Sequence, residues 1–362
     1  LQSAERQSQY PPSPFEFGPV KLLPHLLYRY LYGDGIQPSP GFQATTAINT
    51  LSPGILGELG DHWTLDYTPT WNWYSNHVFH DSVDQSAAVT ASGKVGDDPL
   101  QFAQTFVETH NPLIETGMQT EEKDYVTSLE AQHDFNTAVL LDVSADQAVR
   151  FAAGFPSSRE WDTTDWLRYK LSPRLVASGG VAAGYVSVSE GADQYYYGPE
   201  AQLGINASDQ LKADLTAGYQ ARTFIEEPRQ QLDSPIYSAD VVYSPEEATK
   251  VTLTGSRQVG VSYFVNQTTQ TTDWDLRLEQ RFLRHLFLTA DLDEEYVHYL
   301  SSVSENDTVR ADHDQIINVR LGTTFLRRGS IAALYQRSRN TSSIAGYGFV
   351  SNQVGFEVSY RY

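Results

Sequence analysis

Residues 353–362 read QVGFEVSYRY, and this short stretch already indicates the fold. Apolar or aromatic residues fill every second position, namely Val354, Phe356, Val358, Tyr360 and Tyr362. An apolar residue at every second position predicts a strand with one apolar face, whereas a helix needs apolar residues three and four positions apart. The segment is therefore predicted to be a β-strand up to residue 362.

The same alternation recurs along the chain, in residues 63–73, 211–222, 273–282 and 316–325. Short breaks between such segments lie near Gly60-Asp61, Gly96-Asp97, Asn136-Thr137, Pro173, Ser208-Asp209, Pro245-Glu246, Arg284-His285 and Arg328-Gly329. Longer polar stretches alternate with these breaks. The pattern predicts about 18 strands of roughly 10 residues, and an even number is typical of bacterial outer-membrane barrels.

The predicted fold is all-β: a single transmembrane antiparallel β-barrel with short periplasmic turns and longer extracellular loops. A strand in hydrocarbon cannot leave its backbone edge unpaired, so the last strand must pair with the first, near residues 20–32. We expect residues 19–362 to form the barrel and the polar, Pro-rich residues 1–18 to form a periplasmic extension. The alternative is a large soluble β-sandwich or β-helix, whose strands tend to be shorter.

Composition narrows the function classes. The formal charge of −20 and the absence of a basic patch argue against nucleic acid as a partner. There is no Cys, which excludes disulfides, thiolate metal sites and thiol catalysis. No Ser lies in a G-x-S-x-G motif, so we expect no enzyme, and neither a cofactor nor a metal. An outer-membrane enzyme whose triad is spread across strands ranks last among the alternatives. The sequence starts at Leu1, which we interpret as a secreted chain with its signal peptide removed.

The N-terminal part resembles a known family. Residues 15–35 (FEFGPVKLLPHLLYRYLYGDG) and 51–76 (LSPGILGELGDHWTLDYTPTWNWYSN) are similar to the putative beta-barrel porin 2 family. Tyr32-Gly33-Asp34-Gly35 stands where the family usually has a Tyr-Asp-Asp-Asn turn. Many such proteins occur beside exopolysaccharide synthesis and export genes. The resemblance thus implies an outer-membrane conduit in exopolysaccharide export, with a periplasmic or envelope-spanning partner.

Two other barrel functions remain open. A general or substrate-selective diffusion porin needs no partner, and it would be favoured by a constriction loop folded into the lumen. Residues 108–123 (ETHNPLIETGMQTEEK) are long enough for such a loop. A scaffold barrel occupied by a partner protein is the second alternative. In every case the lipid bilayer of the outer membrane and its assembly machinery are expected partners.

The alternation also predicts which residues face inward. The predicted lumen lining is Asp273, Asp275, Arg277, Glu279, Arg281, Asp291, Asp293, Asp312, Asp314, Arg320, Arg168, Lys170, Lys212 and Asp214. Most of these charges should form cross-strand ion pairs and hydrogen bonds, each of small energy, in a lumen that offers a hydrophilic path. Trp166 and Tyr74 fall on the inner register and are candidates for stacking on sugar rings.

Aromatic residues on the opposite register have other expected roles. Trp71, Trp73, Tyr28 and Tyr30 are predicted to lie at the membrane interfaces, where aromatic girdles form. Phe356, Tyr360 and Tyr362 fit the aromatic C-terminal signal that the outer-membrane assembly machinery reads in barrel proteins as a class.

One acidic tract could hold a cation. Residues 304–314 (SENDTVRADHD) contain Glu305, Asp307, Asp312 and Asp314, and Glu295 precedes them on the previous strand. Oxygen-rich clusters can bind Ca²⁺, but no EF-hand spacing is present. The favoured interpretation is a solvated extracellular loop.

Overall fold

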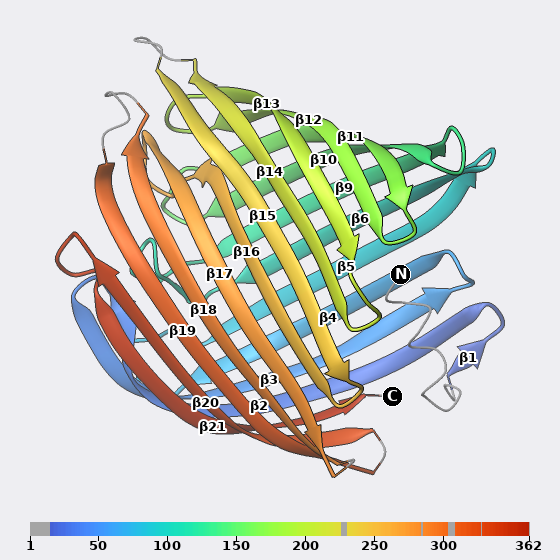
Figure 1. Cartoon of the computed structure of the whole chain (residues 1–362). Helices are drawn as coiled ribbons and strands as arrows, with labels where there is room; N and C mark the ends of the chain where they lie inside the picture. The colour runs from blue at the N-terminus through green and yellow to red at the C-terminus, as the bar shows by residue number, and fades with distance from the viewer. Residues whose placement is uncertain (1–14, 226–229, 284, 303–307, 327, 362) are drawn as a thin grey trace.

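The computed structural model describes residues 15–225, 230–283, 285–302, 308–326 and 328–361. Within them, eighteen strands close into one antiparallel barrel in which neighbours in the chain pair and the last strand pairs with the first (Figure 1). The barrel strands are β2 (Val20–Ser39), β3 (Phe42–Leu59), β4 (Trp63–Tyr74), β5 (Ser82–Val95), β6 (Asp98–Thr109), β9 (Glu122–Asp134), β10 (Val139–Ala152), β11 (Ser158–Ser172), β12 (Leu175–Val188), β13 (Gln194–Asn206), β14 (Leu211–Phe224), β15 (Gln231–Glu246), β16 (Thr249–Val261), β17 (Gln267–Phe282), β18 (Leu286–Ser301), β19 (Thr308–Phe325), β20 (Gly329–Ser342) and β21 (Phe349–Arg361).

Three shorter strands complete the described structure. β1 (Glu16–Phe17) pairs with the start of β2. β7 (Pro112–Leu113) and β8 (Met118–Gln119) form a small hairpin inside the connection between β6 and β9. Of the predicted extension 1–18, residues 1–14 lie outside the described residues. Across the described ranges, no helix has the length and hydropathy needed to span a membrane.

The barrel closes where β2 meets β21, with the register running from His25 opposite Arg361 to Asp34 opposite Asn352. On one face of this seam, Arg29 and Arg320 both pair with the carboxylate of Glu357, at 2.6 and 2.9 Å. On the other face, the rings of Tyr30 and Phe356 stack with centroids 5.7 Å apart. The predicted pairing of the last strand with the first is confirmed.

The connections divide the barrel into two rims. The turn rim carries connections 60–62, 96–97, 135–138, 173–174, 207–210, 247–248, 283–285 and 326–328, which lie at or next to the eight predicted short breaks. Both the start of β2 and the end of β21 belong to this rim. The loop rim carries the other connections, of which the longest is 110–121.

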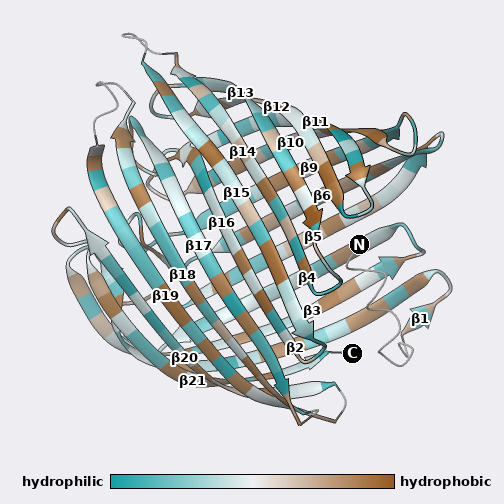
Figure 2. Cartoon of the chain, viewed as in Figure 1, coloured by the Kyte–Doolittle hydropathy of each residue, from teal (hydrophilic) through white to brown (hydrophobic). Residues whose placement is uncertain are grey.

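Successive side chains of a strand point to opposite faces of the wall. Hydrophilic and hydrophobic residues form bands along the strands in Figure 2. One face carries exposed apolar residues such as Trp274 and Leu276, and the other carries most of the charges. Register pairs connect every strand to the next around the closed sheet, so each residue can be assigned to one face. The interfacial aromatics Tyr28, Tyr30, Trp71 and Trp73 lie on the apolar face, together with Phe356 and Tyr360. Tyr362 lies outside the described residues.

Three details of the sequence prediction are wrong. The expected turn at Tyr32–Gly35 is part of β2, where a shift of register between Gly33 and Ile36 marks a β-bulge and Gly35 has a φ of +68°. The strands run to 12–20 residues rather than about 10, because polar segments taken for loops extend the ladders beyond the apolar stretches. Residues 308–314 of the acidic tract are likewise strand, not loop, and residues 303–307 lie outside the described part.

Candidate functional site

The connection 110–121 crosses the barrel at the loop rim. It leaves β6, turns through the β7–β8 hairpin and returns into β9. The buried Thr116 holds the turn through its hydroxyl, which lies 3.2 Å from that of Thr120. At the tip, Gly117 has a φ of +66°, and a side chain there would press against Pro40 and Tyr347 on the other side of the mouth. The tip therefore requires a glycine for its backbone conformation and for space.

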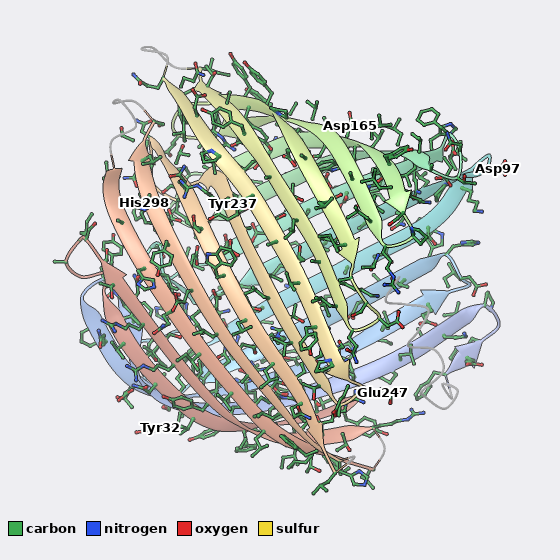
Figure 3. The ribbon with its side chains drawn as sticks, viewed as in Figure 1. Tyr32, Asp97, Asp165, Tyr237, Glu247 and His298 are labelled. Carbon is green, nitrogen blue, oxygen red and sulfur yellow. The ribbon has the colours of Figure 1, made fainter. Side chains whose placement is uncertain are left out.

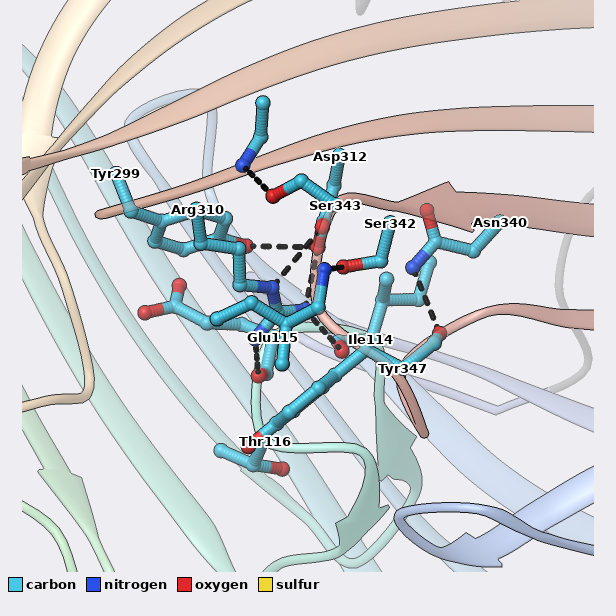
Figure 4. Close-up of polar contacts among 12 residues, drawn as sticks. Ile114, Glu115, Thr116, Tyr299, Arg310, Asp312, Asn340, Ser342, Ser343 and Tyr347 are labelled. Atoms are coloured by element: carbon cyan, nitrogen blue, oxygen red, sulfur yellow. Dashed lines mark hydrogen bonds and ion pairs between the residues drawn. The ribbon is translucent and has the colours of Figure 1, made fainter. Parts of the chain in front are cut away.

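Arg310, near the start of β19, fastens this loop to the far wall (Figure 4). Its guanidinium donates to the backbone carbonyls of Glu115, at 2.7 Å, and of Ile114, at 3.3 Å. Asp312, two residues along the same strand, forms an ion pair with Arg310. The guanidinium also lies 3.7 Å from the ring centroid of Tyr347. Arg310 is only 4% exposed, so these contacts replace its water shell.

The side chain of Glu115 makes a second attachment. Its Oε1 accepts hydrogen bonds from Ser262 Oγ at 2.5 Å and from the Tyr263 backbone N at 2.7 Å. Both donors belong to connection 262–266, between β16 and β17. We call Glu115, Arg310, Asp312, Ser262 and Tyr263 the latch, because together they tie the crossing loop to the opposite wall.

A further bridge runs beside the latch. The hydroxyl of Tyr263 donates a hydrogen bond to the carboxylate of Glu122, at the start of β9. The guanidinium of Arg150, on β10, lies 4.1 Å from the Tyr263 ring centroid and donates to the Val261 carbonyl at 2.9 Å. Since β10 and β16 are six strands apart in the sheet, these contacts span the mouth rather than follow the wall. The loop rim is thus narrowed from two sides.

The latch also identifies the inner face of the wall. Arg310 reaches a loop that starts on the other side of the barrel, so its face of β19 points inward. Asp312, Asp314 and Arg320 share that face. The register places on the same inner face the other predicted lining residues Asp273, Asp275, Arg277, Glu279, Arg281, Asp291, Asp293, Arg168, Lys170, Lys212 and Asp214. Their role as the lining of a conducting pore stays a prediction.

Only some of these charges are paired. Arg277 contacts Asp291 at 2.5 Å, and Arg168 pairs with Asp142. By contrast, within the described chain no Lys, Arg or His forms an ion pair with Asp275, Asp293, Glu295 or Asp314. The expectation of cross-strand ion pairs and hydrogen bonds therefore fits only part of β17–β19, where Asp273 also accepts a hydrogen bond from Ser256 Oγ at 2.5 Å. This wall carries an excess of negative charge.

The two candidate sugar stackers differ. Trp166 is half-buried, with its ring laid over Gly180, and it lines a cavity of about 330 Å³ together with Glu130, Asp142 and Arg168. Tyr74 is buried, with its ring 5.2 Å from that of Phe79. Tyr74 therefore has no free face to offer a sugar, and that prediction is wrong.

Counting only His, Asp and Glu, one group of three in the described residues brings its ligand atoms close enough for a metal, namely Glu108, His110 and Glu121. Lys123 places its ammonium 3.2 Å from Glu108 and 2.7 Å from Glu121. This ammonium already contacts both carboxylates and neutralises half of their charge. The group is therefore an ion-pair cluster and a poor metal site.

Sequence reasoning missed most of the latch. Arg310 lies two residues before Asp312 and four before Asp314, so the period-2 pattern of the strand predicts that it faces inward with them. Its loop partners could not be predicted, because Ile114 and Glu115 reach it from a position 195 residues away. Ser262 and Tyr263 lie in the connection between β16 and β17, where the sequence has no hydrophobic periodicity from which a contact could be predicted.

Glu115 predicts a pH response of the latch. Burial raises the pKa of its carboxyl above 4.5, and the hydrogen bonds from Ser262 and Tyr263 and the charges of Arg150 and Arg310 only partly offset this. The docked loop thus binds this proton more tightly than a released loop. Ionised Glu115 therefore destabilises the docked loop relative to the released loop. This destabilisation is complete above the raised pKa and disappears below pH 4.5, where Glu115 is protonated in both states.

We therefore expect the latch to close more firmly as the pH falls from 7 to 4.5, which single-channel recording would show as less time in the open state. Glu115→Gln mimics the protonated group and should give the closed behaviour at both pH values. If Glu115→Gln keeps the pH response of the unmodified chain, other groups are responsible.

Comparisons with known proteins support the fold. The barrel is similar to Pseudomonas aeruginosa OccK2 (OpdF), at 12% identity over 94% of this chain and 97% of that chain, with a TM-score of 0.50. The structure of Pseudomonas aeruginosa OccK2 in complex with glucuronate is 12% identical over 94% of this chain and 98% of that chain, with a TM-score of 0.50. Pseudomonas aeruginosa OpdL is 14% identical over 96% of this chain and 99% of that chain, with a TM-score of 0.49. None of the curated proteins matches the chain.

The sequence model of one family matches residues 185–362, and its description is putative beta-barrel porin 2. This match lies outside the N-terminal segments that first suggested the family. Together with the closed barrel, the match indicates a porin-like outer-membrane β-barrel channel. The resemblance to the putative beta-barrel porin 2 family is thus confirmed, on residues 185–362.

Proposed function

We propose that this chain is a selective diffusion porin for small solutes, with a preference for cationic ones. The observation that carries the proposal is the loop 110–121, which crosses the mouth and is held on the far wall by Arg310 and Glu115. A loop docked in this way limits the size of what passes. This is the feature expected of a porin and not of an unobstructed conduit for a polymer.

The charge of the inner face supports the cation preference. On β17–β19, Asp275, Asp293, Glu295 and Asp314 are without a basic partner in the described structure. Rings and walls of carboxylates attract cations and repel anions in a pore. OccK2 has been crystallised with glucuronate, an anion. We do not transfer this ligand to the present chain, because its inner face on β17–β19 carries an excess of carboxylates.

Exopolysaccharide export is less well supported. It rests on the family resemblance, and neither the family match nor the similar structures concern export. A long polymer would also need the latch to open fully at every passage. We therefore prefer the porin that was the alternative interpretation of the sequence.

The test is ion selectivity in a planar bilayer. Under a KCl gradient the purified chain should pass K⁺ in preference to Cl⁻ by about threefold or more. The double variant Asp275→Asn/Asp293→Asn should lower that ratio. Asp165→Asn is the matched control, because Asp165 lies on the outer face of β11 (labelled in Figure 3) and should leave the ratio unchanged.

Two results would contradict the proposal. Preference for Cl⁻ would show that the carboxylates on β17–β19 do not control permeation. Steady conductance that a long acidic polysaccharide blocks by threading would restore the export function. Uptake of lysine and glucuronate into liposomes would compare a cation and an anion of similar size, and lysine should enter faster.

A further inference from the structure

Four oxygen-bearing side chains form a row across four neighbouring strands. Asp273 on β17 stands opposite Glu295 on β18, Glu295 stands opposite Asp314 on β19, and Asp314 stands opposite Asn340 on β20. All four lie on the inner face. Directly opposite residues have Cβ atoms about 5 Å apart, so like charges in such a row repel strongly unless something neutralises them.

Two buried oxygens in this row lack any hydrogen-bond partner. Asp314 is 4% exposed and its Oδ1 is unpartnered; Asn340 is 3% exposed and its Oδ1 is also unpartnered. The amide of Asn340 cannot simply be reversed, because its Nδ2 donates to the Tyr347 carbonyl at 3.0 Å. A buried oxygen without a partner costs free energy, and two on facing residues indicate a shared ligand with positive charge.

The protein supplies no such charge itself. The nearest guanidinium on the same strand, Arg310, is engaged by Asp312 and by the crossing loop. In the described chain, Glu295 and Asp314 form no ion pair with any basic side chain. A positive charge that neutralises this row would therefore come from solution, as a bound cation or as a proton.

We propose that Asp314, Asn340 and Glu295 bind a divalent cation of the Ca²⁺ type. Carboxylate and amide oxygens without His or Cys are the ligands of hard cations. Ca²⁺ accepts irregular coordination by several such oxygens, whereas Mg²⁺ demands near-octahedral geometry. This site lies on the wall of the barrel and does not depend on whether the barrel conducts.

The cation would sit directly beneath the latch. Asn340 holds the Tyr347 carbonyl, and the Tyr347 ring packs on Arg310, which holds the loop. A bound cation fixes Asn340 and removes the repulsion between β18 and β19 where Arg310 is anchored. Cation binding should therefore stabilise the docked loop as well as the wall.

Tb³⁺ luminescence tests the proposal on the purified full-length barrel in detergent, after treatment with a chelator. Tyr299 and Tyr347 lie near the site and can sensitise a bound Tb³⁺. We expect a saturable signal that Ca²⁺ displaces. Asp314→Asn and Glu295→Gln should each weaken binding by about tenfold or more. Asp124→Asn, an inner-face carboxylate on β9, is the control and should bind like the unmodified chain.

A variant that gains affinity guards against misfolding as the explanation. Asn340→Asp adds a carboxylate, so it should bind Ca²⁺ more tightly and should show a larger rise in Tm on adding Ca²⁺. The proposal is overturned if the unmodified barrel gives no Ca²⁺-displaceable signal, or if Asp314→Asn binds as well as Asp124→Asn. It is also overturned if Asp314→Asn raises Tm in the presence of chelator but leaves Tb³⁺ binding unchanged. That result would mean that a shared proton, and not a cation, neutralises the row.

Discussion

Replacing Gly355 by valine is expected to prevent the barrel from closing. Gly355 lies on β21 opposite Leu31 of β2, in the seam between the last and first strands. A Cβ at this position would come within 1.8 Å of the Tyr30 carbonyl oxygen, which is backbone and cannot move aside without breaking the ladder. The seam would lose its pairing, and an open edge in hydrocarbon is not tolerated.

The measurement is heat modifiability on a gel together with the amount of protein in the outer membrane. Closed barrels resist unfolding in detergent, so Gly355→Val should lose the folded band and accumulate poorly. Gly93→Val is the matched control, since it is also a strand glycine and a Cβ there meets nothing within 4 Å. Normal folding of Gly355→Val would mean that the seam can shift its register, which would contradict the structure.

Replacing Arg310 by alanine is expected to release the crossing loop. The variant loses the hydrogen bonds from the guanidinium to the Ile114 and Glu115 carbonyls and its packing on Tyr347. Hydrogen bonds from a charged donor contribute about 1.5–3 kcal/mol each, so the docked state should lose at least about tenfold in population. Single-channel recording should show larger conductance and more frequent opening.

Two controls separate the latch from other effects. Arg310→Ala leaves the buried Asp312 without its cationic partner, which is destabilising by itself, and the double variant Arg310→Ala/Asp312→Ala removes that charge. Arg320→Ala removes another inner arginine of β19 that pairs with Glu357 near the turn rim. The loop should stay docked in Arg320→Ala. Conductance of the double variant equal to that of the unmodified chain would show that Arg310 does not control the mouth.

The sequence predicted the barrel well because a membrane wall enforces period-2 alternation on every strand. The eight short turns were located because glycine, proline and polar residues interrupt that period at defined places. Strand lengths were underestimated for the same reason: beyond the hydrocarbon the alternation is no longer required, while the backbone ladder continues, as at residues 308–314.

The functional site was less predictable. The inner register follows from alternation, but pairing along the inner face depends on which strands are neighbours and on their stagger. Asp314 could be assigned to the inner face from the sequence, whereas its facing partner Asn340 could not, because the register between β19 and β20 is a tertiary property. The latch depends on contacts between positions such as Glu115 and Ser262, 147 residues apart, which no local pattern records.

The seam has a consequence for the order of folding. Most strand pairs join segments close in the chain, as Arg277 and Asp291 do at a separation of 14 residues, whereas Arg29 and Glu357 are 328 residues apart. Closing the longer loop costs about 3 kcal/mol more in chain entropy, so the seam should form last. Until then the growing sheet has two free edges, at β2 and at its newest strand. A ribosomal product that stops before Phe349 keeps both edges permanently, and each edge is a template for aggregation.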